Sequence, residues 1–251
     1  MHINKKVALI TGASRGIGAE TAKLFAQHGY AVCINYHQDV LAAQSVEREI
    51  IEAGGDCLLV QADISDSLQV AKLFAQVKEK LGVISVLVNN AGILQPQTKI
   101  TELTPERINT IFKVNVTGSF LCCIEAVKHM AYNHHGQGGA IINVSSMAAI
   151  TGSPNEYIDY AASKGALDTL TKGLAKEVAT EGIRVNAVRP GLIYTQMHKD
   201  GGEAHRVDRL KAKIPLGRGG QPLEVAQAIY WLASDAASFT TGSFIDVAGG
   251  M

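Results

Sequence analysis

A tyrosine and a lysine lie four residues apart in the segment Tyr160-Ala161-Ala162-Ser163-Lys164. In a helix this spacing places the phenol and the ammonium on one face. A tyrosine normally keeps its proton up to about pH 10, and a nearby cation favours the phenolate. The pair could therefore move a proton in general acid–base catalysis. Taken alone, the pair is better explained as a surface contact.

Polar residues at the ends of two apolar segments favour the catalytic interpretation. Ser146 follows a predicted strand at 140–145, and Asn89-Asn90-Ala91-Gly92 ends another at 83–89. In open α/β sheets, ligands bind at the carboxyl ends of the strands. Asn115 lies in a long apolar stretch. We expect it to be a buried polar group, which requires a hydrogen-bonding role.

A glycine-rich segment, Thr11-Gly12-Ala13-Ser14-Arg15-Gly16-Ile17-Gly18, follows the first predicted strand and opens a helix. The pyrophosphate of a dinucleotide must approach such a helix amino terminus closely, and side chains there would obstruct it. Gly12 permits the tight turn, Gly16 lets the backbone approach the phosphates, and Gly18 lets helix and strand pack. The spacing is G-x-x-x-G-x-G and differs from the commoner G-x-G-x-x-G.

The end of the second predicted strand bears on the choice of cofactor. Enzymes that use NAD usually carry an acidic residue there, which would repel the 2′-phosphate of NADP. This strand ends in Asn35-Tyr36-His37, and Asp39 is expected to cap the next helix. Arg15 could pair with the 2′-phosphate, or it could be a solvated loop charge. The sequence favours NADP(H), with NAD(H) possible.

The elements that must position these residues alternate along the chain. Short apolar segments predict strands at 7–11, 31–36, 57–61, 83–89, 140–145, 183–188 and 243–247. Longer segments with helical spacing lie at 17–28, 40–53, 68–81, 109–132, 158–180 and 222–234. This alternation predicts one α/β domain over residues 1–251, a Rossmann-type, doubly wound parallel sheet of about seven strands flanked by helices.

Composition excludes several classes of protein. Of the 251 residues, 47% are hydrophobic and 18% charged, which excludes a largely disordered chain. A formal net charge of zero argues against binding to nucleic acid or to an anionic membrane. No apolar run approaches the roughly 20 residues that span a bilayer. The run after Lys6 is too short for a signal peptide, so we expect a cytoplasmic protein.

The cysteines and histidines do not predict a metal site. The four cysteines, Cys33, Cys57, Cys122 and Cys123, form no C-x-x-C pair and are expected to be reduced thiols. His134 and His135 are adjacent, and adjacent residues rarely converge on one ion.

Together, these segments resemble the short-chain dehydrogenase/reductase family over almost the whole chain. The resemblance rests on 11–18, 89–92, Asn115, Ser146, Tyr160 with Lys164, 190–195 and the ending 242–250. It implies hydride transfer between the nicotinamide of NADP and a carbonyl or secondary alcohol of a small substrate. Tyr160 would be the general acid/base, and Lys164 would lower its pKa and hold the nicotinamide ribose. Ser146 would orient the carbonyl, and Asn115 would anchor a water linked to Lys164.

The resemblance also implies which residues contact the ligands. Cofactor contacts are expected from Gly12, Ser14, Arg15, Gly16, Ile17, Gly18, Asn35, Tyr36, His37, Asp63, Ile64, Asn90, Ala91, Gly92, Tyr160, Lys164, Pro190, Gly191, Ile193 and Thr195. Substrate contacts are expected from Ser146, Met147 and Tyr160, with specificity set by the loop 192–215 and a mobile lid at 197–206.

Two residues compete with the expected catalytic pair. The family commonly has one position fewer between serine and tyrosine, which leaves Ser145 as an alternative to Ser146. Tyr157 is a second phenol, but the residue four positions on is Ala161, so Tyr160 is preferred.

Several functions stay open. Sequences of this type include 3-oxoacyl-[acyl-carrier-protein] reductases and sugar (glucose-type) dehydrogenases. An acidic carrier protein needs a basic dock, and the loop 133–139 has no lysine or arginine, which favours a small carbonyl compound. A nucleotide-binding sensor or scaffold would not need an intact Ser146, Tyr160 and Lys164. The apolar helices 109–132 and 158–180 are expected to form a subunit interface, and the resemblance implies a homotetramer.

Overall fold

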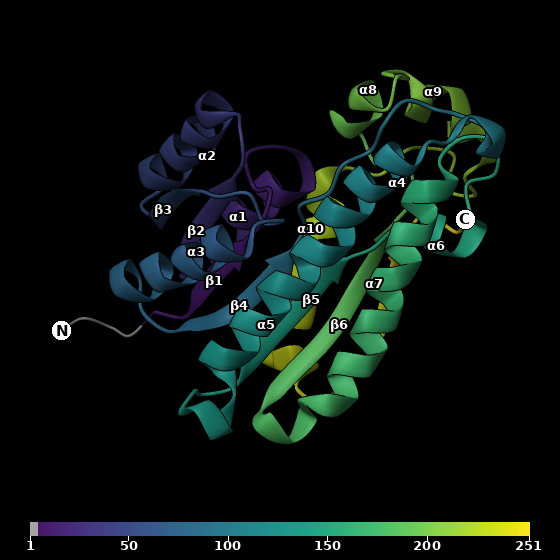
Figure 1. The fold of residues 1–251 in the computed structure, drawn as a ribbon. Coiled ribbons are helices and arrows are strands. Elements are labelled where there is room, and N and C mark those ends of the chain that lie inside the picture. Colours follow the sequence, from purple (N-terminus) through teal and green to yellow (C-terminus); the bar gives the residue numbers. More distant parts are fainter. Residues whose placement is uncertain (1–4) are drawn as a thin grey trace.

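A computed structural model describes residues 5–251; residues 1–4 of the predicted domain lie outside the described part. Seven parallel strands form one sheet in the order β3-β2-β1-β4-β5-β6-β7 (Figure 1). Their bounds are β1 Val7–Ile10, β2 Ala31–Tyr36, β3 Asp56–Gln61, β4 Ile84–Asn89, β5 Gly139–Val144, β6 Ile183–Pro190 and β7 Phe244–Val247. The predicted doubly wound α/β fold is confirmed.

Helices cover both faces of the sheet because its strands are apolar on both sides. In β1, Val7 and Leu9 belong to one core and Ala8 and Ile10 to the other. The first core is covered by α3 (Ser67–Lys80), α5 (Ser119–Met130) and α7 (Ile158–Glu177), which lie in front of the sheet in Figure 1. The second is covered by α1 (Gly16–Gln27), α2 (Val40–Glu52) and α10 (Pro222–Ala233).

The helix starts follow the local sequence. Asp39 caps α2, its carboxylate accepting a hydrogen bond of 3.0 Å from the N–H of Ala42, as predicted. Pro105 and Pro222 occupy the first turns of α4 (Pro105–Phe112) and α10, where the missing N–H costs nothing.

Several predicted boundaries are corrected. β6 extends to Pro190 because its last residues pair with β7, Pro190 opposite Val247. The helix expected at 109–132 begins at Pro105, and a π-helical segment, Lys113–Gly118, separates α4 from α5. Unpredicted short helices are α6 (Ala148–Thr151), α8 (Met197–Asp200), α9 (Arg206–Leu210) and 3₁₀ turns at Ile100–Glu102, Tyr132–His134, Ala179–Glu181, Lys211–Lys213 and Asp235–Ala237.

The continuous helix Pro105–Met130 is long and apolar enough, by length and composition, to cross a membrane. This corrects the expectation that no such stretch exists. The inner face of the helix belongs to the protein core, where Ile111, Cys122 and Met130 are fully buried. On the outer face, Phe120 and Ile124 are 43% and 47% exposed. The apolar residues of this helix therefore fill the core on one face and form an apolar strip on the surface at the other.

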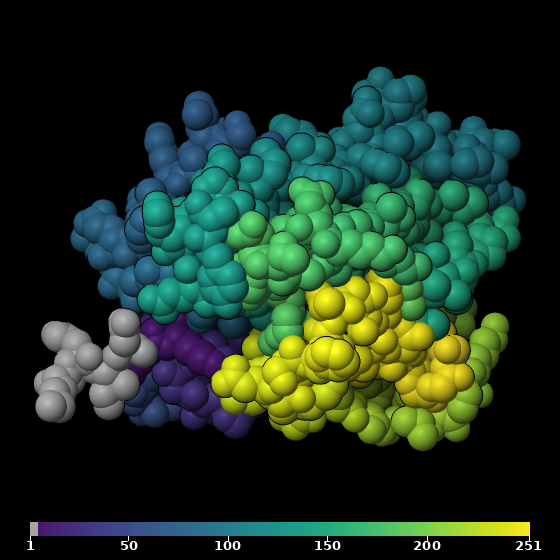
Figure 2. Space-filling view, turned by 90° about the horizontal axis from the view of Figure 1, so that it is seen from below, coloured from purple at the N-terminus to yellow at the C-terminus, as the bar shows by residue number. Residues whose placement is uncertain are grey.

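The C-terminal part of the chain closes the edge of the sheet beside α7. Figure 2 shows it (yellow) in contact with the green part of the chain that contains α7. Lys172 of α7 lies over the ring of Phe244 in β7, 5.4 Å from its centroid.

The sheet order also fixes where a ligand can bind. Chain connections leave β1 and β4 in opposite directions, so a crevice forms beyond their carboxyl ends. The segments 11–18 and 90–92 follow these two strands, which places them at the crevice.

Candidate active site

The glycine-rich segment packs directly against the residues that follow β4. A Cβ atom on Gly12, whose φ is +61°, would lie 2.8 Å from Cα of Ala91. A Cβ atom on Gly18 would collide with Nδ2 of Asn90. Neither position can accept a side chain unless its neighbours move, so these glycines allow the close approach that the sequence predicted.

The amino terminus of α1 is open to an anion. Arg15 is the N-cap residue and its side chain makes no capping hydrogen bond, whereas Asp39 and Asp66 cap α2 and α3. The first turn of α1 holds no acidic residue. Uncapped N–H groups at a helix start bind phosphate well.

Thr11 and Asn90 join the two segments of the crevice. The hydroxyl of Thr11 accepts hydrogen bonds from the N–H groups of Asn90 and Ala91, each 3.0 Å long. The amide of Asn90 donates to the carbonyls of Thr11 and Gly12, at 2.9 and 3.0 Å. Asn90 was expected to contact the cofactor. Its amide N–H groups instead hold the glycine-rich loop in place.

Only one of the three side chains expected at the tip of β2 is available to a ligand. Asn35 is buried: its amide donates to the carbonyl of Ala62 at 3.1 Å, and its oxygen accepts from the N–H of Gly12 at 3.4 Å. Tyr36 is also buried. His37 alone of the three is exposed, with Nε2 4.0 Å from the carboxylate of Asp63. Asn35 thus shapes the loop from inside and presents no free amide to a ligand.

The residues after β3 are held in place by local contacts. Burial raises the pKa of Asp63, but hydrogen bonds from the hydroxyl and N–H of Ser65 outweigh it, so the pKa lies below its usual value. Ile64 is buried against Gly118 of the π-helical segment, where a Cβ atom would lie 2.7 Å from its side chain.

Arg15 extends from the glycine-rich loop toward the segment after β6. Its guanidinium pairs with the carboxylate of Asp200 in α8 at 2.8 Å, and both side chains are largely exposed. Exposed pairs of this kind contribute little to stability, so Arg15 can exchange this partner for another anion. Ser14 beside it is half-buried.

Tyr160 and Lys164 lie one turn apart on α7, as predicted, and both line one cavity. Lys164 is 2% exposed. Its ammonium donates a hydrogen bond of 2.8 Å to the carbonyl of Val144, at the end of β5. The same ammonium lies 5.6 Å from the ring centroid of Tyr160.

Burial dominates the ionisation of both groups. It raises the pKa of Tyr160 to about 12, against a lowering hydrogen bond with Ser146. It lowers the pKa of Lys164 to about 8, against the raising effect of Asp168. The expected lowering of the phenol pKa is therefore not present in this structure. The lysine ammonium faces the ring and the Val144 carbonyl, and the effect of desolvation on the phenol outweighs its attraction in the absence of ligand.

The structure separates the competing candidates. Both serines line the cavity, but the hydroxyl of Ser145 donates to the carbonyl of Lys164 at 3.2 Å, whereas Ser146 acts to lower the pKa of Tyr160. The hydroxyl of Tyr157 donates to the carbonyl of Gly201 at 3.1 Å. The geometry thus favours Ser146 and Tyr160.

Asn115 is fully buried in the π-helical segment and holds the irregular segment that follows β4. Its oxygen accepts from the N–H of Ile93 at 2.8 Å, and its amide donates to the Ile93 carbonyl and to Ser163 at 3.1 and 3.0 Å. A Cβ atom on Gly92 would lie 3.4 Å from both Asn115 and the Lys164 ammonium. Asn115 and the ammonium of Lys164 therefore both lie close to Gly92, and a side chain at that position would crowd them.

A cavity of about 190 Å³ brings the predicted residues together at the carboxyl edge of the sheet. It is lined by ten of them: Ile17, Asn90, Ser146, Met147, Tyr160, Lys164, Pro190, Gly191, Ile193 and Thr195. The segment after β6 crosses above the glycine-rich loop, so that a Cβ atom on Gly16 would meet the methyl of Thr195 at 3.5 Å.

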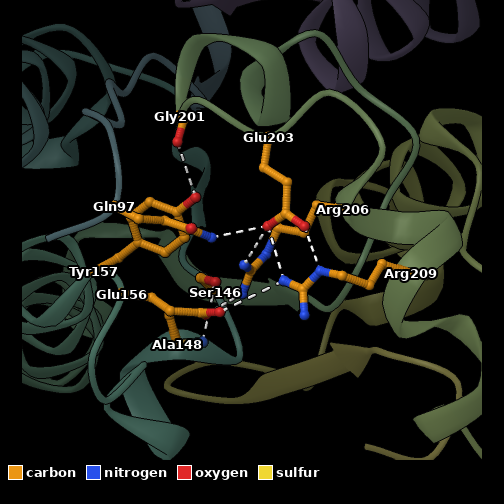
Figure 3. A network of polar contacts seen from close by, with 9 residues as sticks. All are labelled: Gln97, Ser146, Ala148, Glu156, Tyr157, Gly201, Glu203, Arg206 and Arg209. Carbon is orange, nitrogen blue, oxygen red and sulfur yellow. Dashed lines mark hydrogen bonds and ion pairs between the residues drawn. The ribbon is translucent and has the colours of Figure 1, made fainter.

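Segment 197–206, the expected lid, lines this cavity through Met197, His198 and Arg206 and contacts the body of the protein. Figure 3 shows its contacts with the body: Tyr157 with Gly201, Gln97 with Glu203, and Glu156 with Arg206. Arg206, which lies within the predicted specificity loop 192–215, and Met251, which was not predicted, also line the cavity. The contact of the last residue with the cavity depends on the tertiary fold and has no local sequence signal.

A buried ion pair beside Tyr160 was also missed. The carboxylate of Asp159, whose side chain is 1% exposed, pairs with Nε of Arg107 at 2.6 Å. Its other oxygen accepts from the N–H of Tyr160 at 2.8 Å. Arg107 also donates to the carbonyl of Pro96 at 2.7 Å, which ties the cavity rim to the start of α7.

We expect Arg107→Met to lower the free energy of unfolding by roughly 3–5 kcal/mol, because it leaves the Asp159 carboxylate buried and uncompensated. Urea unfolding followed by circular dichroism measures the loss. Adding Asp159→Asn to this variant should recover part of it, since the second change removes the unpaired charge. No recovery would contradict the role of the pair.

The chain is similar to known oxidoreductases over almost its whole length. The family model described as Enoyl-(Acyl carrier protein) reductase matches residues 12–251. The uncharacterized oxidoreductase YgfF of Escherichia coli (strain K12) is 60% identical over 244 residues, covering 97% of this chain and 99% of that protein.

Solved structures show the same fold with cofactor bound. A 3-ketoacyl-(acyl-carrier-protein) reductase from Brucella melitensis, complexed with NADH, has a TM-score of 0.90 at 37% identity, covering 98% of this chain and 97% of that one. A short chain dehydrogenase from Burkholderia cenocepacia J2315, in complex with NADP, has a TM-score of 0.88 at 32% identity with the same coverage. The chain therefore belongs to the short-chain dehydrogenase/reductase family of nicotinamide-dependent oxidoreductases.

Proposed function

We propose that this chain transfers a hydride between the nicotinamide of NADP and a carbonyl or secondary alcohol of a small substrate. The observation that carries the proposal is the meeting of Tyr160, Ser146 and Lys164 at one cavity of about 190 Å³. A sensor or scaffold would have no use for a phenol and a serine hydroxyl that share a cavity with a buried ammonium.

The residues present fit a dinucleotide. The uncapped start of α1 suits its pyrophosphate, and the glycine-rich loop leaves no side chain in the way. Thr195 and Gly191 reach the same cavity from the segment after β6, where the nicotinamide would lie. Lys164 would hold the nicotinamide ribose. We propose that Asn115 anchors a water molecule next to Lys164.

Reduction would use the chain's own groups to supply the proton. The hydride for the carbonyl carbon would come from NADPH held in this crevice. Ser146 donates a hydrogen bond that fixes the carbonyl oxygen, and Tyr160 gives that oxygen its hydroxyl proton. The resulting phenolate is stabilised by the ammonium of Lys164, because both groups are shielded from water. Oxidation of an alcohol follows the same path in reverse.

NADP is favoured over NAD by charge. The exposed tip of β2 carries His37 and no carboxylate, and Arg15 is available to a 2′-phosphate once it leaves Asp200. A doubly charged phosphate binds a guanidinium more strongly than one exposed carboxylate does. Specificity for the rest of the substrate would come from the loop 192–215 and Met147.

The outer surface of α5 and α7 suggests self-association. A groove of about 800 Å³ between them is lined by apolar and small residues, with Lys128 and Glu177 also present. A second copy related by a two-fold axis could cover Phe120 and Ile124. We propose a homotetramer in the cytoplasm, where the four free thiols stay reduced.

Tyr160→Phe should lower the rate of NADPH-dependent reduction of small uncharged ketones by about 100- to 10,000-fold, because it removes the proton donor. Affinity for NADPH, measured by nicotinamide fluorescence, should change little. Tyr157→Phe is the matched control and should cost far less. A Tyr160→Phe enzyme with the wild-type rate would contradict the proposal.

The value of kcat/KM for reduction should fall as pH rises through about 8, since Lys164 then loses the charge that stabilises the phenolate. Asp168 raises the pKa of Lys164, so Asp168→Asn should move the fall to lower pH. The exposed substitution Glu52→Gln should leave the profile in place. A profile that does not respond to Asp168→Asn would contradict this role of Lys164.

Arg15→Ala should weaken NADPH binding by about tenfold or more, the usual value of a charge-assisted hydrogen bond, while NADH binding stays the same. Fluorescence titrations of the wild type and of Arg15→Ala, each with NADPH and with NADH, measure these affinities. Tighter binding of NADH than NADPH by the wild type would mean that Arg15 does not select the cofactor.

Light scattering at micromolar concentration should give a mass four times that of the chain. Ile124→Glu should reduce it, because a charge would be buried in the α5–α7 contact. Ile51→Glu, on the exposed face of α2, is the control. A monomeric wild type would rule out the proposed assembly.

A further inference from the structure

A buried arginine lines the substrate cavity. Arg206 of α9 is 9% exposed and shares the cavity with Tyr160, Ser146 and Met147. Its guanidinium lies over the ring of Tyr157, 5.1 Å from the centroid. An arginine placed in this way in a pocket normally recognises a carboxylate or phosphate group of the ligand.

This guanidinium is already paired, however. Glu156 accepts a hydrogen bond from one terminal nitrogen, and Glu203 accepts one of 3.2 Å from the other. Arg209 adds a second positive charge, donating to Glu203 at 2.8 Å and lying 3.7 Å from Glu156 (Figure 3). The cluster therefore holds two guanidinium groups and two carboxylates, and its net charge is zero.

The two glutamates are held differently. Glu203 belongs to the lid and keeps Arg209 and Gln97 as partners besides Arg206. Glu156 belongs to the body of the protein, and its main direct partner is Arg206. Its backbone carbonyl accepts a hydrogen bond of 3.0 Å from the N–H of Thr98, so the loop stays anchored whatever the side chain. Without the Glu156 charge, Arg206 and Arg209 would share one carboxylate, that of Glu203, and the cluster would carry one uncompensated positive charge.

We propose that Glu156 determines substrate specificity by occupying Arg206, so that the cavity accepts uncharged carbonyl compounds and rejects carboxylates. A substrate carboxylate would bring a third negative charge to two guanidinium groups in a partly desolvated site, where the excess charge is costly. This inference rests on the proposed carbonyl-reducing function and narrows its substrate class.

The test measures binding, not turnover. The probes are 4-oxopentanoate and its ethyl ester, titrated by calorimetry into the complex with NADP⁺. The wild type should bind the ester and bind the acid at least about tenfold more weakly. Glu156→Gln keeps the shape and removes the charge; it should strengthen binding of the acid by about tenfold or more, as a charge-assisted contact with Arg206 would, with little change for the ester.

Gln97→Ala is the matched control for loosening of the lid. It removes the 2.8 Å hydrogen bond to Glu203 without changing charge, so it should alter binding of both probes alike and leave their ratio at the wild-type value. Equal binding of the two probes by the wild type would overturn the proposal, as would acid binding that Glu156→Gln leaves unchanged. Failure of the proposed function would be seen separately, as absence of NADPH-dependent turnover with every ketone.

Discussion

The site depends on the burial of one ammonium group. Lys164 is removed from water and must be satisfied by the protein, and the carbonyl of Val144 accepts its hydrogen bond at 2.8 Å. That contact fixes α7 against the end of β5. Tyr160 lies one turn earlier on the same helix, so the position of its phenol follows from the position of the lysine. Asp168, one turn later, keeps part of the ammonium's charge compensated.

Buried amides carry out the rest of the assembly. Asn115 joins the segment after β4 to the π-helical turn, and Asn90 joins that segment to the glycine-rich loop. Deeper in the sheet, the amide of Asn89 donates to Asn143 at 3.0 Å, and Asn143 donates to Thr171 of α7 at 2.8 Å. Each amide satisfies backbone or side-chain groups from two different elements. The carboxyl ends of β1, β4 and β5 are therefore held in one arrangement before any ligand arrives.

The sequence was sufficient for features that depend on local pattern. Strand periodicity, the glycine spacing and the Tyr160–Lys164 turn predicted the sheet and the cavity-lining groups. It was insufficient for features that depend on tertiary distance. Asn35 was expected to contact the ligand but makes internal hydrogen bonds, and Arg206, placed by the sequence only within the specificity loop 192–215, lines the cavity. The pKa of Tyr160 was expected to fall and is raised, because burial outweighs a cation that faces the ring.

The most direct test of this account is the pKa of Lys164 itself. It can be measured by NMR titration of lysine labelled with ¹³C at Cε, with Lys164→Arg identifying the resonance by its absence. Burial predicts a pKa of about 8. A value near 10.5, that of a solvated lysine, would mean that the ammonium is not held in the desolvated position beside Tyr160, and would contradict the account.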